Sequence, residues 1–276
     1  MSECDHNCEN CAEKCDVPTV DKPHEMSDIK RVIAVVSGKG GVGKSAVTAM
    51  LSCAMSQKGY TCAVLDADIT GASVPKMFGV GGSVIGDETG LYPAETAKGT
   101  KLISSNLLLE NETDPIVWRG PIIAGMVKQF WTDVIWGDVD YMFVDCPPGT
   151  GDVPLTVFQS VKVDGIVVVA TPQDLVSMIV EKAVNMANMM KIPILGIVEN
   201  MSYAVCPHCG ERIELYGDGK SVDAVTQKFG IPLLAEVPHD IRIVQAADSG
   251  KIEELEVDYL AAAADILESG LPVSRE

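Results

Sequence analysis

The chain has 276 residues, and its 21 Lys and Arg against 39 Asp and Glu give a formal net charge of −18. This acidic excess argues against a protein that holds nucleic acid or anionic lipid through a basic face, although a local phosphate site is compatible with it. Hydrophobic residues make up 47% of the chain, which is enough for one large core and excludes general disorder.

No apolar run approaches the roughly 18 residues that cross a bilayer. The N-terminal region has neither the basic nor the apolar stretch of a secretory signal. We therefore expect a cytoplasmic protein that binds no membrane and no nucleic acid.

The first 28 residues differ from the rest of the chain. They are polar and acidic, and they hold four of the nine cysteines, at Cys4, Cys8, Cys11 and Cys15. An odd number of cysteines with this clustering suits metal or redox chemistry better than a disulfide framework. We predict that residues 1–28 form a flexible Cys-rich tail.

From Arg31 onward, short β-branched runs alternate with longer amphipathic ones, the pattern of βα units around a parallel sheet. Buried strands are predicted at Val32–Val36, Cys62–Leu65, Tyr141–Val144, Ile166–Ala170, Ile194–Val198 and Leu233–Ala235. Helices are predicted at Ala46–Gln57, Ile122–Trp136, Leu175–Met190, Ser221–Phe229 and Val257–Leu267. Residues 29–276 should form one doubly wound, mostly parallel α/β domain.

Two insertions interrupt this alternation. Residues 79–118 are rich in Gly, Ser and Thr and are predicted to form peripheral hairpins. Residues 201–218 contain the sequence Cys206-Pro-His-Cys209-Gly.

The first predicted strand runs into Ser37-Gly-Lys-Gly-Gly-Val-Gly-Lys-Ser45 and then into a helix, so a phosphate-loop pattern stands in its required context. Backbone N–H groups of such a loop close around phosphates beside the positive end of the helix. Lys44 should reach the β- and γ-phosphates, and Ser45 should bind Mg²⁺. The predicted nucleotide contacts are Gly38, Lys39, Gly40, Gly41, Val42, Gly43, Lys44, Ser45 and Ala46.

Lys39 is a second cation in this loop, and its side chain cannot easily fold onto the same phosphates as Lys44; a solvated loop lysine is the alternative interpretation. The sequence of the loop resembles that of the deviant Walker A ATPases. The resemblance implies that Lys39 reaches the nucleotide of a second subunit, with a face-to-face homodimer as the hydrolytic unit.

Acidic residues follow two of the predicted strands. Carboxylates at the carboxyl edge of a parallel sheet face the ligand crevice. Asp145 fits the residue that holds Mg²⁺, and Gly149 is expected to offer an N–H to the γ-phosphate. Asp68 fits the residue that orients the attacking water, whereas Asp66 either contacts the nucleotide or caps a turn.

The base-binding end of the site is predicted from two further strand ends. Asn200 is positioned to read the adenine edge through its amide, or alternatively to start a turn. Pro238 and Asp240 follow the last predicted strand and are expected to form part of the base pocket.

Cys206 and Cys209 have the spacing of a knuckle that directs two thiolates at one metal, which is half of a four-coordinate site. A second chain, the N-terminal tail or His208 would have to complete it. A twofold dimer would bring together four thiolates, which suit a bridging [4Fe–4S] cluster or Zn²⁺.

The tail offers a second set of four thiolates within 12 residues, at Cys4, Cys8, Cys11 and Cys15. Their compact spacing resembles cluster-binding tails more than zinc modules, which usually separate two pairs by a longer loop. A cluster, Zn²⁺ and no metal all stay open for this segment.

Five motifs together resemble the Mrp/ApbC/Nbp-type iron–sulfur carrier ATPases, over roughly residues 30–250. They are the phosphate loop, Asp66-Ala-Asp-Ile-Thr-Gly-Ala-Ser-Val-Pro75, Trp118-Arg-Gly-Pro121, Asp145-Cys-Pro-Pro-Gly-Thr-Gly-Asp152, and Glu199-Asn-Met-Ser202 followed by the Cys pair. The resemblance implies a homodimeric ATPase that carries a [4Fe–4S] cluster between paired knuckles and delivers it to apo-proteins. The tight spacing of the tail cysteines departs from that family.

Three alternatives share the phosphate loop. A MinD/ParA-like organising ATPase should carry a basic membrane or DNA surface, which the sequence lacks. A protein resembling nitrogenase iron protein would place single cluster cysteines far apart. A nucleotide-gated zinc-binding dimer would keep the Cys pair without cluster transfer.

Overall fold

A central sheet of eight strands organises the computed structural model, which describes residues 20–109, 120–216 and 220–274. The strand order is β10-β7-β6-β1-β5-β2-β4-β3. All neighbouring pairs are parallel except β3 with β4. The strands are β1 (Asp28–Ser37), β2 (Cys62–Asp66), β3 (Ala94–Glu95), β4 (Lys101–Ile103), β5 (Asp138–Asp145), β6 (Gly165–Ala170), β7 (Ile194–Asn200) and β10 (Leu233–Val237). The predicted doubly wound α/β fold is confirmed, and each of the six predicted strands is present.

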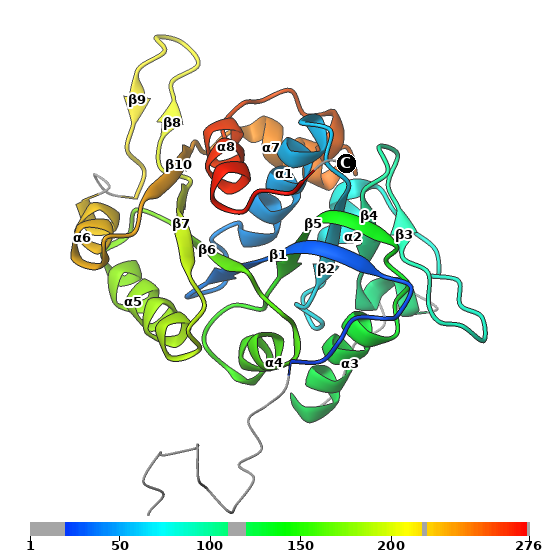
Figure 1. The fold of residues 1–276 in the computed structure, drawn as a ribbon. Coiled ribbons are helices and arrows are strands. Elements are labelled where there is room, and N and C mark those ends of the chain that lie inside the picture. The colour runs from blue at the N-terminus through cyan, green and yellow to red at the C-terminus, as the bar shows by residue number, and fades with distance from the viewer. Residues whose placement is uncertain (1–19, 110–119, 217–219, 275–276) are drawn as a thin grey trace, which may run out of the picture.

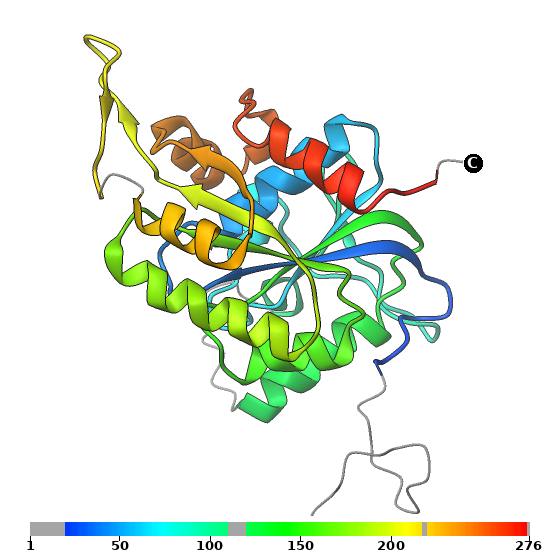
Figure 2. The ribbon, with the colours of Figure 1, turned by 60° about the vertical axis from the view of Figure 1, so that its left-hand side comes forward.

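Helices cover both faces of this sheet (Figures 1 and 2). One face carries α1 (Lys44–Gln57), α2 (Val74–Phe78), α7 (Ile241–Asp248) and α8 (Ala261–Gly270). The other carries α3 (Gly120–Thr132), α4 (Asp152–Ser160), α5 (Asp174–Met189) and α6 (Lys220–Phe229). Short 3₁₀ turns are formed by Ser105–Leu108 and Ile252–Glu254.

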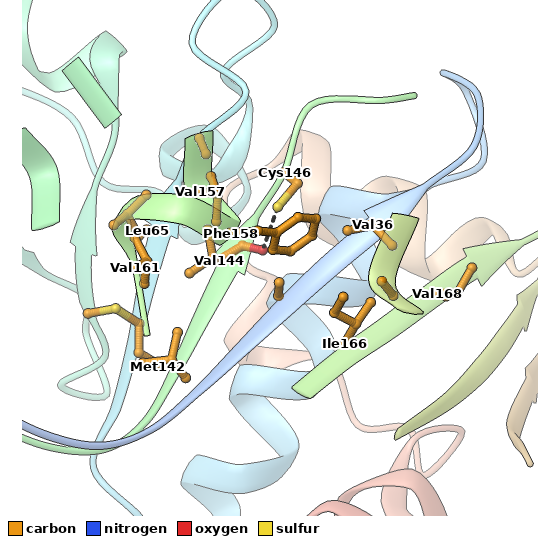
Figure 3. Packing of buried hydrophobic residues seen from close by; sticks show 14 of the residues in the cluster. Val36, Leu65, Met142, Val144, Cys146, Val157, Phe158, Val161, Ile166 and Val168 are labelled. Carbon is orange, nitrogen blue, oxygen red and sulfur yellow. Dashed lines mark hydrogen bonds between the residues drawn. The ribbon is translucent and has the colours of Figure 1, made fainter. Parts of the chain in front are cut away.

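The central strands are apolar on both faces because both faces are covered. In β1, Val32, Ala34 and Val36 enter the core cluster under α3 to α6, whereas Ile33 and Val35 enter the cluster under α1, α7 and α8. Figure 3 shows the first of these clusters, where Phe158 of α4 packs against the sheet beside Cys146. The Cys146 thiol donates to the Val144 carbonyl over 3.8 Å, so this cysteine is a core residue.

Part of the predicted insertion at residues 79–118 lies at the end of the sheet; residues 110–119 lie outside the described residues. Strands β3 and β4 pair as a hairpin, and β4 also joins the central sheet parallel to β2, which was not predicted. Three short helices, α2, α4 and α7, were not predicted. The predicted helix at residues 122–136 ends at Thr132 because Val134 and Ile135 pair with Leu91 instead. The last helix begins at Ala261 rather than Val257.

The predicted tail is shorter than 28 residues. Residues 1–19, with their four cysteines, lie outside the described residues, but Asp21 is held against the domain. Its N–H donates to the Ser160 carbonyl, 2.9 Å, and its carbonyl accepts from the Trp131 indole, 2.8 Å. The Ser27 hydroxyl donates to the Val134 carbonyl. These bonds fix the start of the domain at the amino edge of the sheet.

A candidate nucleotide site and a cysteine hairpin

The phosphate loop connects β1 to α1, as predicted from the sequence. Gly41 and Gly43 have φ angles of +80° and +76°, which glycine adopts without strain. A side chain at Gly43 would also meet the Asn200 amide nitrogen, 2.2 Å from an added Cβ, so the loop and β7 can approach only because this residue is glycine. The loop borders a pocket of about 250 Å³ lined by Ser37, Lys39, Gly40, Gly41, Val42, Gly43, Lys44, Ser45, Ala46, Asp68, Ser73, Met77 and Pro148.

Asp145 is the last residue of β5; it is fully buried and, like Asp66, is not among the residues that line the pocket. Its two oxygens accept hydrogen bonds from Lys44 Nζ and Ser45 Oγ, each over 2.6 Å. Burial alone would lower the pKa of Lys44, but the Asp145 carboxylate outweighs it and raises that pKa above its ordinary value. Lys44 is therefore a fixed cation. A hydroxyl beside a carboxylate is an oxygen donor set that fits Mg²⁺.

The structure separates the roles of the two aspartates after β2. Asp66 is buried, accepts from the Asp68 N–H over 3.1 Å and from the Ser104 hydroxyl over 3.0 Å, and does not line the pocket. Burial, reinforced by the Asp145 charge, raises the pKa of Asp66 to about 7. Asp68 is only half-buried and lines the pocket. These bonds show that Asp66 shapes the turn, and its contact with nucleotide stays a prediction.

Lys39 and Gly149 have partners within their own chain. The Lys39 ammonium donates to the side-chain oxygen of Gln173. The Gly149 N–H donates to the Ser37 carbonyl over 2.8 Å, so it is not aimed at the pocket and the predicted phosphate contact would require that bond to break. Gly38 begins the loop and likewise does not line the pocket.

The predicted base-binding residues come together in a second pocket of about 200 Å³. It shares Gly43 and Ala46 with the phosphate pocket, so the two adjoin. Its other lining residues are Asn200, Met201, Pro238, His239, Asp240, Ile243, Val244, Ala247 and Asp248. The wall contributed by α7 was missed in the sequence, although Asp240 as a helix N-cap before an apolar pattern is a usable signal.

Two of these residues are engaged in ways that limit what they can bind. The Asn200 amide donates to the Val42 carbonyl over 2.8 Å, which ties β7 to the phosphate loop. The Asp240 carboxylate accepts from Arg242 and from the Tyr259 hydroxyl, and the Arg242 bonds hold its pKa down at about 2. Asp240 therefore stays ionised and shapes the pocket wall rather than offering a free acceptor.

Cys206 and Cys209 lie at the turn of a two-stranded hairpin, β8 (Ala204–Val205) and β9 (Arg212–Ile213), which projects from the body of the molecule (Figures 1 and 2). Backbone N–H groups of Cys209 and His208, together with the Cys209 side chain, lower the pKa of the Cys206 thiol. The turn thus favours a thiolate, the form that binds metal. Among the described residues, no group of three or more His, Cys, Asp or Glu is arranged to hold a metal ion.

The hairpin and the start of the domain lie at opposite edges of the sheet. The hairpin follows the carboxyl end of β7, whereas Asp21 is held at the amino edge, and β1 between those edges is about 33 Å long.

The strand–loop–helix, the buried Lys44–Asp145 pair and the doubly wound sheet define a P-loop NTPase. Comparison with known proteins narrows the class. A family model described as "ParA: NUBPL iron-transfer P-loop NTPase" matches residues 28–269. The chain is 41% identical over 261 residues to the iron-sulfur cluster carrier protein of Methanocaldococcus jannaschii, covering 91% of this chain and 90% of that one. It is 44% identical over 235 residues to that of Clostridium perfringens, covering 82% of each.

Solved structures agree with this placement. The nucleotide-binding protein of Archaeoglobus fulgidus in complex with ADP is 45% identical, with a TM-score of 0.75 over 84% of this chain and 90% of that one. The septum site-determining protein MinD of Pyrococcus horikoshii, complexed with Mg-ADP, is 21% identical with a TM-score of 0.58 over 89% and 96%, a likeness of fold alone. The chain is an ATPase that belongs to the NUBPL iron-transfer P-loop NTPase family.

The predicted resemblance to iron–sulfur carrier ATPases is thereby confirmed. Within the described part of the chain, no helix combines the length and apolarity needed to cross a bilayer.

Proposed function

We propose that two copies of this protein hold a [4Fe–4S] cluster between their Cys206 and Cys209 pairs and use ATP to govern its delivery to apo-proteins. The observation that carries the proposal is the Cys206 and Cys209 pair on a hairpin that continues directly from a nucleotide-site strand, with Cys209 exposed and the pKa of the Cys206 thiol lowered. Exposed thiols suit a cargo that must leave, and a reducing compartment such as the cytoplasm would keep them reduced.

The number of thiols supports a dimer. The hairpin of one chain offers two thiols, and a cubane cluster takes four ligands. A twofold axis beside the hairpin would supply the other pair. The same arrangement would let Lys39 leave Gln173 and approach the nucleotide of the partner, as the resemblance to deviant Walker A ATPases implies.

The geometry of the two pockets supports the part of the proposal that concerns ATP. Lys44 would leave Asp145 for the β- and γ-phosphates, and Asp68, the carboxylate that lines the pocket, would orient the attacking water. Ser45 and Asp145 would hold Mg²⁺, which neutralises phosphate charge when bound. The adenine would occupy the adjoining pocket between Asn200 and α7.

The nucleotide site and the cysteine hairpin are connected both through the chain and through hydrogen bonds. Asn200 ends β7 and holds the Val42 carbonyl in the phosphate loop. Three residues later the Tyr203 carbonyl accepts from the His239 N–H over 2.6 Å, at the wall of the base pocket. A change at either contact would move the base of the hairpin, so nucleotide state has a short path to the distance between paired cysteines.

Anaerobic reconstitution tests the proposal. We expect about four irons and four sulfides per dimer in the wild type and in a form lacking residues 1–19, and none in Cys206→Ser/Cys209→Ser. Cys53→Ser is a matched control, because that cysteine lies on α1 away from the hairpin. Light scattering reports whether the cluster-loaded species is a dimer.

Zinc without iron in the wild type would instead support the zinc-binding dimer. Iron lost on deleting the tail and kept in the hairpin variant would transfer the cluster site to the tail cysteines and overturn the proposal.

A further inference from the structure

Asp145 has a third partner that the phosphate-loop pattern does not include. The Thr48 hydroxyl, on α1 one turn after Lys44, lies 2.8 Å from Asp145 Oδ1. Thr48 is fully buried. The carboxylate thus receives Lys44 and Thr48 on one oxygen and Ser45 on the other.

Nucleotide binding should affect the three partners of Asp145 differently. Lys44 is the loop lysine that goes to the phosphates, and Ser45 is the hydroxyl that goes to Mg²⁺. Both therefore leave or share their bond with Asp145 when Mg-ATP binds. Thr48 does not line the phosphate pocket, so no ligand competes for its hydroxyl.

We propose that Thr48 is a positioning residue, which holds the Asp145 carboxylate in the orientation that presents its other oxygen to Ser45 and to Mg²⁺. Without this hydroxyl, Oδ1 of a fully buried carboxylate would lose its remaining partner as soon as Lys44 moved to the phosphates. The loss falls on the nucleotide-bound state, because in the free protein Lys44 still satisfies Oδ1. It is largest with Mg²⁺, which depends on the orientation of the same carboxylate.

A competing bond within the helix does not remove this role. The Thr48 hydroxyl also lies 3.0 Å from the Lys44 carbonyl, the usual bond of a threonine to the preceding turn, and its one proton can serve one acceptor at a time. An ionised carboxylate is the stronger acceptor, and its distance is the shorter of the two. The β-branched side chain has few rotamers in a helix, so the hydroxyl stays near Asp145.

The inference depends on the ATPase site and not on the proposed cluster. It is tested with three variants. Thr48→Val keeps the shape of the side chain and removes the hydroxyl, and Thr48→Ala removes both the hydroxyl and the methyl group. Thr48→Ser keeps the hydroxyl and removes the methyl group. Ser52→Ala is the matched control, since Ser52 is a buried hydroxyl one turn further along α1 with no hydrogen-bond partner among the described residues.

The measurement is nucleotide binding without turnover. A fluorescent, non-hydrolysable ATP analogue is titrated at a series of Mg²⁺ concentrations and in excess chelator. For Thr48→Val and Thr48→Ala we expect the Mg²⁺ concentration at half-saturation to rise roughly tenfold to a hundredfold, the effect of losing a hydrogen bond to a charged group. Affinity in chelator should fall by less, because no Mg²⁺ then depends on the orientation of the Asp145 carboxylate, and Thr48→Ser and Ser52→Ala should match the wild type.

Wild-type Mg²⁺ dependence in Thr48→Ala would overturn the inference. So would an equal defect in Thr48→Ser, which would assign the effect to the missing methyl group, or an equal loss of affinity with and without Mg²⁺. A thermal melt of each variant checks folding, and if the valine is not accommodated, the alanine and serine pair gives the same comparison.

Discussion

The nucleotide site and the cysteine hairpin are built in opposite ways. Around Asp145, charged groups are buried and tied by short hydrogen bonds, and the surrounding strands are long. The hairpin has two strands of two residues each, with Cys209 exposed at its turn. A buried, preorganised site suits the repeated stabilisation of one transition state, whereas a pair of accessible cysteines on a small hairpin suits cargo that is bound and released.

The nucleotide site and the cysteine hairpin are linked at the carboxyl end of β7. Asn200 contacts the phosphate loop, and the next residues lead into the hairpin. The chemistry of each region should therefore be separable by mutation, and only substitutions near this strand end should affect both.

Lys44→Ala should produce the largest effect. Removing the fixed cation from the phosphates should lower kcat/KM for ATP at least about a hundredfold, the typical effect of losing a preorganised electrostatic contact. Iron per dimer after reconstitution should not change, because the hairpin has no contact with Lys44. Lys251→Ala, an exposed lysine paired with Glu254, is the control. Loss of iron in Lys44→Ala would show that the two regions are not separable.

Asn200→Ala should have a smaller effect, and on both regions. Loss of the bond to the Val42 carbonyl should weaken ATP binding by about fivefold, as expected for one neutral hydrogen bond. The difference in cluster-transfer rate with and without ATP should shrink, because this bond is part of the link to the hairpin. Asn185→Ala, on an exposed position of α5, is the control. An unchanged response of transfer to ATP would remove Asn200 from the link.

Arg212→Ala should loosen the hairpin alone. The Arg212 guanidinium lies 3.7 Å from the Tyr203 ring centre and forms an ion pair with Glu236 over 2.7 Å, which fastens β9 to β10. Both contacts are exposed, so each is worth at most about 1 kcal/mol. Hydrogen exchange of the Cys206 amide, which donates to the Glu211 carbonyl, should quicken a few-fold while that of β1 is unchanged. Equal exchange in both proteins would contradict this assignment.

Much of the nucleotide site was predictable because it is contiguous in sequence. The phosphate loop, its flanking strand and its helix occupy neighbouring residues. Asp68, Asp145 and Asn200 were predicted because each follows or ends a predicted strand. Other site residues have partners that come from elsewhere in the chain: Gln173 for Lys39, Ser37 for Gly149 and Tyr259 for Asp240. Such pairings follow from strand register and loop closure, which a pattern of residue types does not contain.

The elements of the fold likewise divide into those that the local sequence predicted and those that it did not. Six strands were found from β-branched runs, because buried parallel strands are apolar on both faces. The three-residue strand β4 and the five-residue helix α2 are too short to carry a period of their own, and their conformations depend on β2 and on neighbouring helices. Short elements are thus specified by tertiary contacts rather than by local sequence.

Asp66→Asn should change the stability of the fold, and the change should depend on pH. The carboxyl has a pKa of about 7 in the folded protein, because it is buried beside Asp145, against about 3.9 in an unfolded chain. Between these values the folded state keeps a proton that the unfolded state has released, so the free energy of unfolding falls as pH rises through this range. Asparagine has no such loss.

The thermal midpoint of Asp66→Asn minus that of the wild type should therefore grow as pH rises from about 5 to about 7 and then level off. A change of about 2–4 °C would correspond to about 1 kcal/mol in a protein of this size. Asparagine can still accept from the Asp68 N–H, so the turn that holds Asp68 in the pocket is preserved. A difference that is constant with pH would show that Asp66 is ionised throughout, and that the nucleotide site buries a second negative charge beside Asp145.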